Sequence, residues 1–152
     1  MSGILERRGG RPKAREVALR VLYEVDLTGD DPREALALAL GRFRFTAEGR
    51  EHARRLVHGF LEEADRVDSA LAGVLQHWEL DRLGGVERAL LRLAVTELLL
   101  EPGVPAAVVM EETLRLAHRY GDERSPAFVN GVLDAAARSI RPGELAPPEG
   151  RG

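Results

Sequence analysis

The chain contains no cysteine among its 152 residues. Disulfide bonds, thiolate metal sites and cysteine nucleophiles are therefore excluded. Aromatic residues make up only 5% of the sequence, so a core must be built mainly from Leu, Val and Ala, which pack well between helices. No apolar run reaches membrane-spanning length, and the first residues, MSGILERRGG, lack the hydrophobic stretch of a secretory signal. We expect a cytoplasmic protein that does not associate with membranes.

The sequence also offers little for catalysis or for binding a cofactor. It has neither the Walker pattern nor G-x-G-x-x-G, and no serine lies in a nucleophile elbow. The four histidines are scattered without the spacing of metal ligands, and we expect them at the surface: His52, His58, His77 and His118. We therefore predict that the chain is not an enzyme and needs no cofactor or metal.

Positive charge, in contrast, is concentrated near one end. Residues 7–20, RRGGRPKAREVALR, hold six basic residues and one acid, a formal charge of +5; because the whole chain carries −3, the remainder carries −8. A localised basic segment on an acidic body attracts a polyanion, and arginine suits phosphates and stacks on unpaired bases. A solubilising tail is the alternative. The basic residues Lys13, Arg15 and Arg20 continue into a predicted helix, which favours the functional interpretation.

Apolar residues at helical spacing predict helices that begin near residues 11, 31, 46, 65, 86, 105 and 125, with N-caps at Asp31, Thr46 and Asp65. The helix after residue 85 is the most hydrophobic and should be central. No alternating pattern predicts a strand. We therefore predict an all-α, single-domain bundle of about seven helices at residues 11–140, after a flexible basic arm at 1–10 and before a disordered tail at 141–152.

Side-chain directions follow from this arrangement. With the apolar stripe of the first helix buried, Arg11, Lys13 and Arg15 should lie on or beside its solvent side. Tyr23 lies near the edge of the stripe, where it could stack on a base or simply pack. Phe128, at the start of the last helix, is either a core residue or an anchor for a partner. In the connection GRFRFT, both phenylalanines should enter the core and both arginines should point outward.

Five motifs occur in a specific order along the chain. They are A-R-E-x-A-L-R-x-L-Y at residues 14–23, G-V-E-R-A-x-L-R-x-A-x-x-E-L at 85–98, Val104-Pro105, E-x-x-x-L-A at 112–117 and S-x-x-F-V-N-G-V-L-D at 125–134. Each is weak alone. Together, in this order and behind an Arg-rich segment, they resemble the NusB family of bacterial transcription antitermination factors over nearly the whole chain.

The resemblance implies an all-helical protein that binds the boxA sequence of single-stranded nascent RNA as a heterodimer with NusE, a protein of the small ribosomal subunit. It implies a place in the RNA polymerase antitermination complex and in ribosomal RNA transcription. By position, the family's RNA-binding segment corresponds to Arg11, Lys13 and Arg15, with Arg7 and Arg8 reaching phosphates from the segment before Pro12. Further residues that the resemblance implies are Tyr23 and Phe128 for RNA, and Asp81, Arg82, Glu87, Arg124 and Phe128 for NusE.

Three positions depart from the family pattern. Pro12 interrupts a run that is more continuously basic in some relatives, so the arm enters its helix differently here. Arg124 stands where some relatives carry an acid near the shared protein and RNA surface, and Glu111 stands where asparagine is common. Contacts at Arg124 and Glu111 therefore cannot be transferred from relatives.

Two other functions remain as alternatives. A similar helical domain precedes the catalytic domain of ribosomal RNA cytosine methyltransferases, and without a cysteine this chain could at most be a detached recognition domain of that type. The other alternative is a helical adaptor that binds only proteins. The oligomeric state is also open, because an apolar helix face left over after core packing would support a homodimer that hides the RNA surface.

Overall fold

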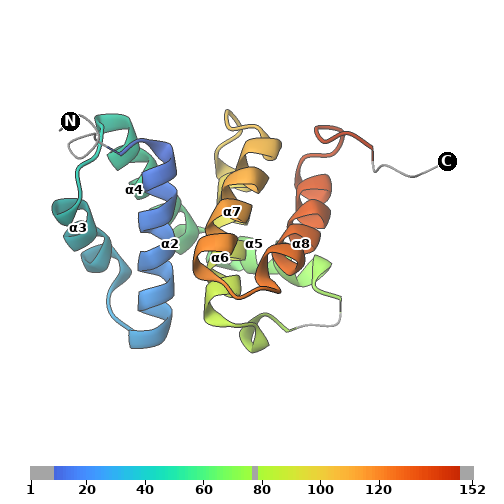
Figure 1. Ribbon diagram of the computed structural model, residues 1–152, viewed down its shortest axis with the longest axis horizontal. Coiled ribbons are helices and arrows are strands. Elements are labelled where there is room, and N and C mark those ends of the chain that lie inside the picture. The colour runs from blue at the N-terminus through green and yellow to red at the C-terminus, as the bar shows by residue number, and fades with distance from the viewer. Residues whose placement is uncertain (1–8, 77–78, 148–152) are drawn as a thin grey trace.

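The computed structural model describes residues 9–76 and 79–147. These residues form seven α-helices and one short 3-10 helix, with no β-structure beyond a single bridge between Gly9 and Phe45 (Figure 1). The helices are α2 (Arg11–Thr28), α3 (Pro32–Arg42), α4 (Ala47–Glu62), α5 (Ala64–Val74), η1 (Leu80–Arg82), α6 (Gly85–Leu100), α7 (Ala106–Tyr120) and α8 (Ser125–Ile140). The predicted all-α bundle is confirmed. Within the described ranges no helix is long and apolar enough to cross a bilayer.

Helix ends follow the local sequence at most positions. Asp31 accepts a hydrogen bond from the backbone N–H of Arg33 at 2.9 Å, and Thr46 accepts one from that of Gly49 at 2.9 Å, so both predicted N-caps are confirmed. Asp65 was predicted wrongly as a cap. The break between α4 and α5 is only one residue long, so α5 already begins at Ala64 and Asp65 lies in its first turn.

Helix α6 is the centre of the bundle. It packs against α2, α4, α5, α7 and α8, and it is therefore buried on almost every side. Leu90, Leu91 and Val95 are fully buried. The hydrophobicity of this segment, high all round rather than along one stripe, is typical of such a central helix.

The other helices are arranged around α6. Helices α2, α3 and α4 form a group at one end of the long axis of the molecule, α7 lies near the middle beside α6, and α8 lies toward the other end (Figure 1). Helix α2 contacts α3, α4 and α6, so more of its circumference is covered than a single stripe would require.

The described residues continue to 147, into the segment 141–152 that the sequence predicted as a disordered tail, and residues 148–152 lie outside them. The guanidinium of Arg141 donates to the backbone carbonyls of Leu98 at 3.1 Å and Glu101 at 2.9 Å. The carboxylate of Glu144 accepts from the backbone N–H of Ala106 at the start of α7. Arg141 and Glu144 therefore belong to the helical unit, because they bind backbone groups left open at the ends of α6 and α7.

Replacing Leu90 with alanine should lower the free energy of unfolding by about 2–5 kcal/mol, because it empties a fully buried position in the central helix. Replacing Leu38, whose side chain is 68% exposed, should change it by less than about 0.5 kcal/mol. Urea unfolding followed by circular dichroism measures both. Similar losses in the two variants would contradict the central position of α6.

Candidate nucleic-acid interface

The chain enters α2 beside the connection between α3 and α4. The backbone N–H of Gly9 donates to the carbonyl of Arg44 at 2.8 Å, and that of Thr46 donates to the carbonyl of Gly9 at 2.9 Å. The two segments approach so closely that a Cβ atom at Gly49 would lie 2.4 Å from the carbonyl oxygen of Gly9. The start of the described chain is thereby fixed against α4. Arg7 and Arg8, two of the predicted RNA-binding residues, lie outside the described residues.

Two predicted RNA-binding residues lie at the accessible start of α2. Arg11 is 36% exposed and forms an ion pair with the more exposed Glu48 at 3.0 Å. Such a surface pair contributes about 0–1 kcal/mol, so an anion can compete for Arg11 at little cost. Lys13 has no ion pair among the described residues, and its ammonium lies over the ring of Phe43, 4.5 Å from the centroid.

Arg15, in contrast, is not at the surface, and its predicted position on the solvent side is wrong. It is 5% exposed, and its guanidinium binds the carboxylate of Glu97 on α6 at 2.6–3.1 Å. The reason is the three-sided packing of α2, which covers a face that the apolar stripe alone does not include. Arg15 has no open face for RNA.

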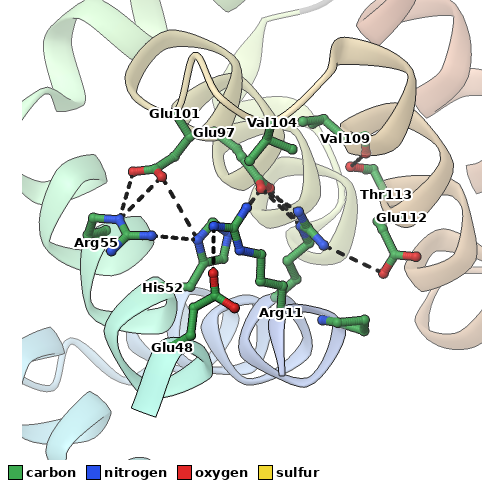
Figure 2. Close-up of polar contacts among 12 residues, drawn as sticks. Arg11, Glu48, His52, Arg55, Glu97, Glu101, Val104, Val109, Glu112 and Thr113 are labelled. Atoms are coloured by element: carbon green, nitrogen blue, oxygen red, sulfur yellow. Dashed lines mark hydrogen bonds and ion pairs between the residues drawn. The ribbon is translucent and has the colours of Figure 1, made fainter. Parts of the chain in front are cut away.

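The ion pair of Arg15 belongs to a larger buried network (Figure 2). The Nε2 atom of His52 lies 3.0 Å from the carboxylate of Glu97, and its Nδ1 atom lies 3.2 Å from a guanidinium nitrogen of Arg55. Because Arg55 can only donate, Nδ1 must accept, and His52 is the neutral tautomer that donates from Nε2 to Glu97. Arg55 also binds Glu101 at 3.0 Å. The network therefore connects α2, α4 and α6.

His52 is thus a residue whose position the sequence analysis missed. It was expected at the surface, but it is fully buried. Its position in α4, one residue before the buried Ala53 and four before the buried Leu56, was the available signal.

Burial alone raises the pKa of Glu97, but hydrogen bonds from His52 and Arg15 and the positive charge of Arg15 outweigh it. The pKa of Glu97 consequently lies below its ordinary value. Glu97 stays ionised and holds Arg15 in place.

Glu16, the one acid of the basic stretch, is also buried. Its carboxylate accepts a hydrogen bond from the hydroxyl of Tyr120 and lies 3.4 Å from the guanidinium of Arg119. Burial of the hydroxyl and this hydrogen bond raise the pKa of Tyr120. Glu16 is therefore bound to α7 and is not presented beside Lys13.

Tyr23 lies where α2 meets the start of α6. A Cβ atom at Gly85 would lie 3.0 Å from the Tyr23 ring, so the glycine of the G-V-E-R motif lets the ring approach α6 closely. Tyr23 lines an apolar groove, which we call the Tyr23 groove. Its lining residues are Leu19, Arg20, Tyr23, Glu24, Leu27, Val86 and Tyr120.

Most of the predicted partner-binding residues surround a second hollow. It is lined by residues of η1, the start of α6 and the start of α8: Arg82, Leu83, Gly84, Glu87, Asp122, Arg124, Ser125 and Phe128. Glu87 accepts a hydrogen bond from the hydroxyl of Ser125, which joins α6 to α8. Asp81 is exposed on η1 but does not line this hollow. The structure thus brings Arg82, Glu87, Arg124 and Phe128 together.

Arg88 supports this second hollow, a role that was not predicted from the sequence. Its guanidinium binds Asp26 of α2 at 2.7 Å and the backbone carbonyls of Leu80 and Leu83 at 3.2 Å and 2.9 Å. It therefore fixes η1 relative to α2 and α6. Residues 9–76 and 79–147 contain no cluster of His, Cys, Asp or Glu that could hold a metal ion.

Replacing Glu97 with glutamine should lower the free energy of unfolding near neutral pH by up to about 3–5 kcal/mol, because it leaves the buried Arg15 with only the more distant carboxylate of Glu112, 3.9 Å away, as a counter-charge. The folded pKa of Glu97 is depressed, so its stabilisation is complete above the ordinary carboxyl pKa of about 4.3 and is lost as the pH falls through the folded pKa. The difference between the wild type and Glu97→Gln should narrow over that acidic range. Urea unfolding at a series of pH values measures it.

The control is Glu48→Gln, which removes only the exposed pair with Arg11 and should cost less than about 1 kcal/mol. Equal losses for the two substitutions, or a pH-independent loss for Glu97→Gln, would contradict the role of the buried network.

Comparison with known proteins agrees with this geometry. The family model described as "NusB family" matches residues 12–138. The transcription antitermination protein NusB of Bacillus pumilus is 41% identical over 131 residues, which cover 86% of this chain and 97% of that protein. A solved structure of NusB from T. maritima is 33% identical, with a TM-score of 0.80, and the match covers 86% of this chain and 92% of that one.

A further solved structure is described as antitermination factors NusB and NusE in complex with dsRNA. It is 35% identical, with a TM-score of 0.73, and the match covers 85% of this chain and 96% of that chain. The relatives are named for antitermination of transcription, and this agrees with the prediction that the chain is not an enzyme. The family model, the identity over most of the chain and the shared fold together show that this chain belongs to the NusB family.

Proposed function

We propose that this protein is an RNA-binding transcription antitermination factor that recognises boxA RNA together with NusE and acts in ribosomal RNA transcription. The observation that carries the proposal is the convergence of η1, α6 and α8 on one hollow, lined by Arg82, Glu87, Arg124 and Phe128. The relative solved with NusE and double-stranded RNA supports a role for both partners. A homodimer stays one of the two oligomeric states that the sequence leaves open.

The RNA contact starts at α2. Arg11 and Lys13 supply attraction to phosphates that does not depend on base sequence, and the Arg-rich residues before Gly9 add to it. Arg15 is not among the contacting residues, because its guanidinium is buried against Glu97. Its role is to hold α2 in the orientation that exposes Lys13.

The NusE contact lies around the second hollow. Phe128 offers a partly exposed aromatic side chain, and Glu87 holds the start of α8 through Ser125. Arg124 makes this rim more positive than in relatives that carry an acid there, so the local contact to the partner or to RNA differs in this protein. Tyr23 connects the proposed RNA contact with the proposed NusE contact, since it belongs to α2 and packs against the start of α6.

Replacing Arg11 and Lys13 together with alanine should weaken boxA binding and reduce its salt dependence. About four neutralised phosphates give a slope of log K against log salt near −3, and losing two contacts should reduce its magnitude by about 1.4. Filter binding with boxA RNA and a scrambled RNA, with and without NusE, measures both quantities. The control is Arg66→Ala on α5, an exposed arginine paired with Glu63.

Wild-type protein should bind boxA more tightly and more selectively when NusE is present. Unchanged affinity and salt slope in the double variant would exclude the start of α2 as the RNA contact. Equal binding of boxA and scrambled RNA in the presence of NusE would overturn the proposed function.

Replacing Phe128 with alanine should weaken NusE binding by about tenfold or more, as expected for a central aromatic anchor. Because Phe128 also packs partly against the core, Phe128→Leu is the companion variant that keeps apolar volume and removes the ring. Isothermal titration calorimetry with NusE measures both variants, with Arg138→Ala on the far half of α8 as the control. NusE affinity equal to that of wild type in both Phe128 variants would show that the partner binds elsewhere.

A further inference from the structure

The positive charges of this molecule fall into two sets. Most described arginines are held in ion pairs, from the buried Arg15 to exposed pairs such as Arg66 with Glu63. A smaller set has no ion pair to any described residue: Lys13, Arg20, Arg42, Arg44, Arg50 and Arg124. All of these except Arg124 belong to α2, to the last residue of α3, to the connection between α3 and α4, or to the start of α4.

These cations surround one aromatic residue, Phe43. The ammonium of Lys13 lies 4.5 Å from the centroid of the Phe43 ring, and the guanidinium of Arg20 lies 5.9 Å from it. Arg42 and Arg44 flank Phe43 in the chain, and both are exposed. We call this surface the Phe43 patch: Lys13, Arg20, Arg42, Phe43, Arg44 and Arg50.

The connection has a fixed shape that keeps these charges outward. Phe45 is buried, with the guanidinium of Arg50 5.8 Å from its ring centroid, and the bridge between Gly9 and Phe45 pins the strand-like segment to the start of α2. As predicted, Phe45 enters the core, whereas Phe43 is only half-buried. An anchored loop presents its arginines without the ordering cost that a mobile segment incurs on binding.

Two hollows share Phe43, and each contains cations without an ion pair. One lies between α2 and α3 and includes Arg20 and Arg42; the other runs onto α4 and includes Arg44 and Arg50. Acids are fewer here. Glu24 lines the first hollow, and Glu51 lines the second, where it is paired with Arg54 at 3.6 Å.

The Phe43 patch is continuous with the proposed RNA contact. Lys13 belongs to both, and Arg20 lines both the hollow beside Phe43 and the Tyr23 groove. Gly9, where the described chain begins, is hydrogen-bonded to Arg44 and Thr46 of the same connection. The patch lies in the α2, α3 and α4 group, which is at the opposite end of the long axis from α8 (Figure 1).

We propose that the Phe43 patch binds the phosphate backbone of a single-stranded RNA segment that flanks the recognition sequence. The proposal extends the proposed function and rests on it. Arginine-rich surfaces that follow a strand beside an aromatic residue suit RNA backbone without reading its sequence. An acidic protein is the other partner that such charges could bind. The continuity with the start of α2 favours the same RNA strand.

The test compares the recognition sequence alone with longer RNAs that contain it. Each longer RNA carries about ten additional nucleotides of unrelated single strand, on the 5′ side in one and on the 3′ side in the other. This length is within the usual range for one binding groove. The patch variant is Arg42→Ala/Arg44→Ala/Arg50→Ala in the full chain. The matched control is Arg33→Ala/Arg66→Ala/Arg138→Ala, which removes the same charge from arginines that are ion-paired away from Phe43. Fluorescence anisotropy with NusE present measures affinity, and thermal unfolding checks the fold.

Wild type and control should bind one extended RNA more tightly than the short RNA, and the patch variant should lose that gain, about tenfold near 0.1 M salt. Its salt slope on the extended RNA should fall in magnitude by about 2, for three lost phosphate contacts at about 0.7 each. All three proteins should bind the short RNA alike.

Three results would overturn the inference. The patch variant could bind extended RNA as tightly as the control does, it could lose the same affinity for short and extended RNA, or it could lose NusE binding when RNA is absent. The last result would identify a protein-binding surface. If boxA and scrambled RNA bind equally, the proposed function is rejected independently of the Phe43 patch. Scrambled RNAs of the two lengths then still test whether the Phe43 patch binds RNA backbone.

Discussion

The ion pair between Arg15 and Glu97, sealed between α2 and α6, is the interaction on which the N-terminal half of the molecule depends. Two buried charges are costly to desolvate, and that cost is offset only when each remaining polar atom finds a partner in good geometry. Here His52 and Arg55 complete the shell from α4. A shift of α2 along or around its axis would leave a charge unpaired in the core, so the network selects one position for this helix.

The same pair determines what α2 exposes. An α-helix turns by about 100° per residue, so Lys13 and Arg20 lie about 160° and 140° around the axis from Arg15. Fixing Arg15 inward therefore turns these two cations outward and nearly into line with each other, where both approach Phe43. A buried residue thus controls the direction of an exposed charged face without touching any ligand.

Regular features of the fold could be predicted from the sequence because they depend on residues close together in the chain. Helical periodicity and the caps at Asp31 and Thr46 are local, and they gave the helices and most of their ends. Arg15 and His52 could not be placed this way. Their burial depends on Glu97, which is 82 residues from Arg15 and 45 residues from His52 in sequence, and nothing local distinguishes a paired arginine from an exposed one.

The candidate site, like the fold, could be predicted from the sequence only in part. Arg82, Glu87, Arg124 and Phe128 were identified through motifs, and their meeting around one hollow follows from the packing of α6 against α8. The Phe43 patch was not predicted, although Arg42 and Arg44 were expected to point outward. It becomes visible only when each cation is compared with its surroundings, since the sequence does not reveal which positive charges already have a counter-charge.

The uneven distribution of these charges gives the molecule an electric dipole. Among the described residues, all cations without counter-charges except Arg124 gather at the α3 end, while the chain as a whole carries a net charge of −3. In the field of a polyanion such a body experiences a torque as well as a force. The protein would turn its α3 end toward RNA before contact, and its acidic remainder would repel nucleic acid that approaches from other directions.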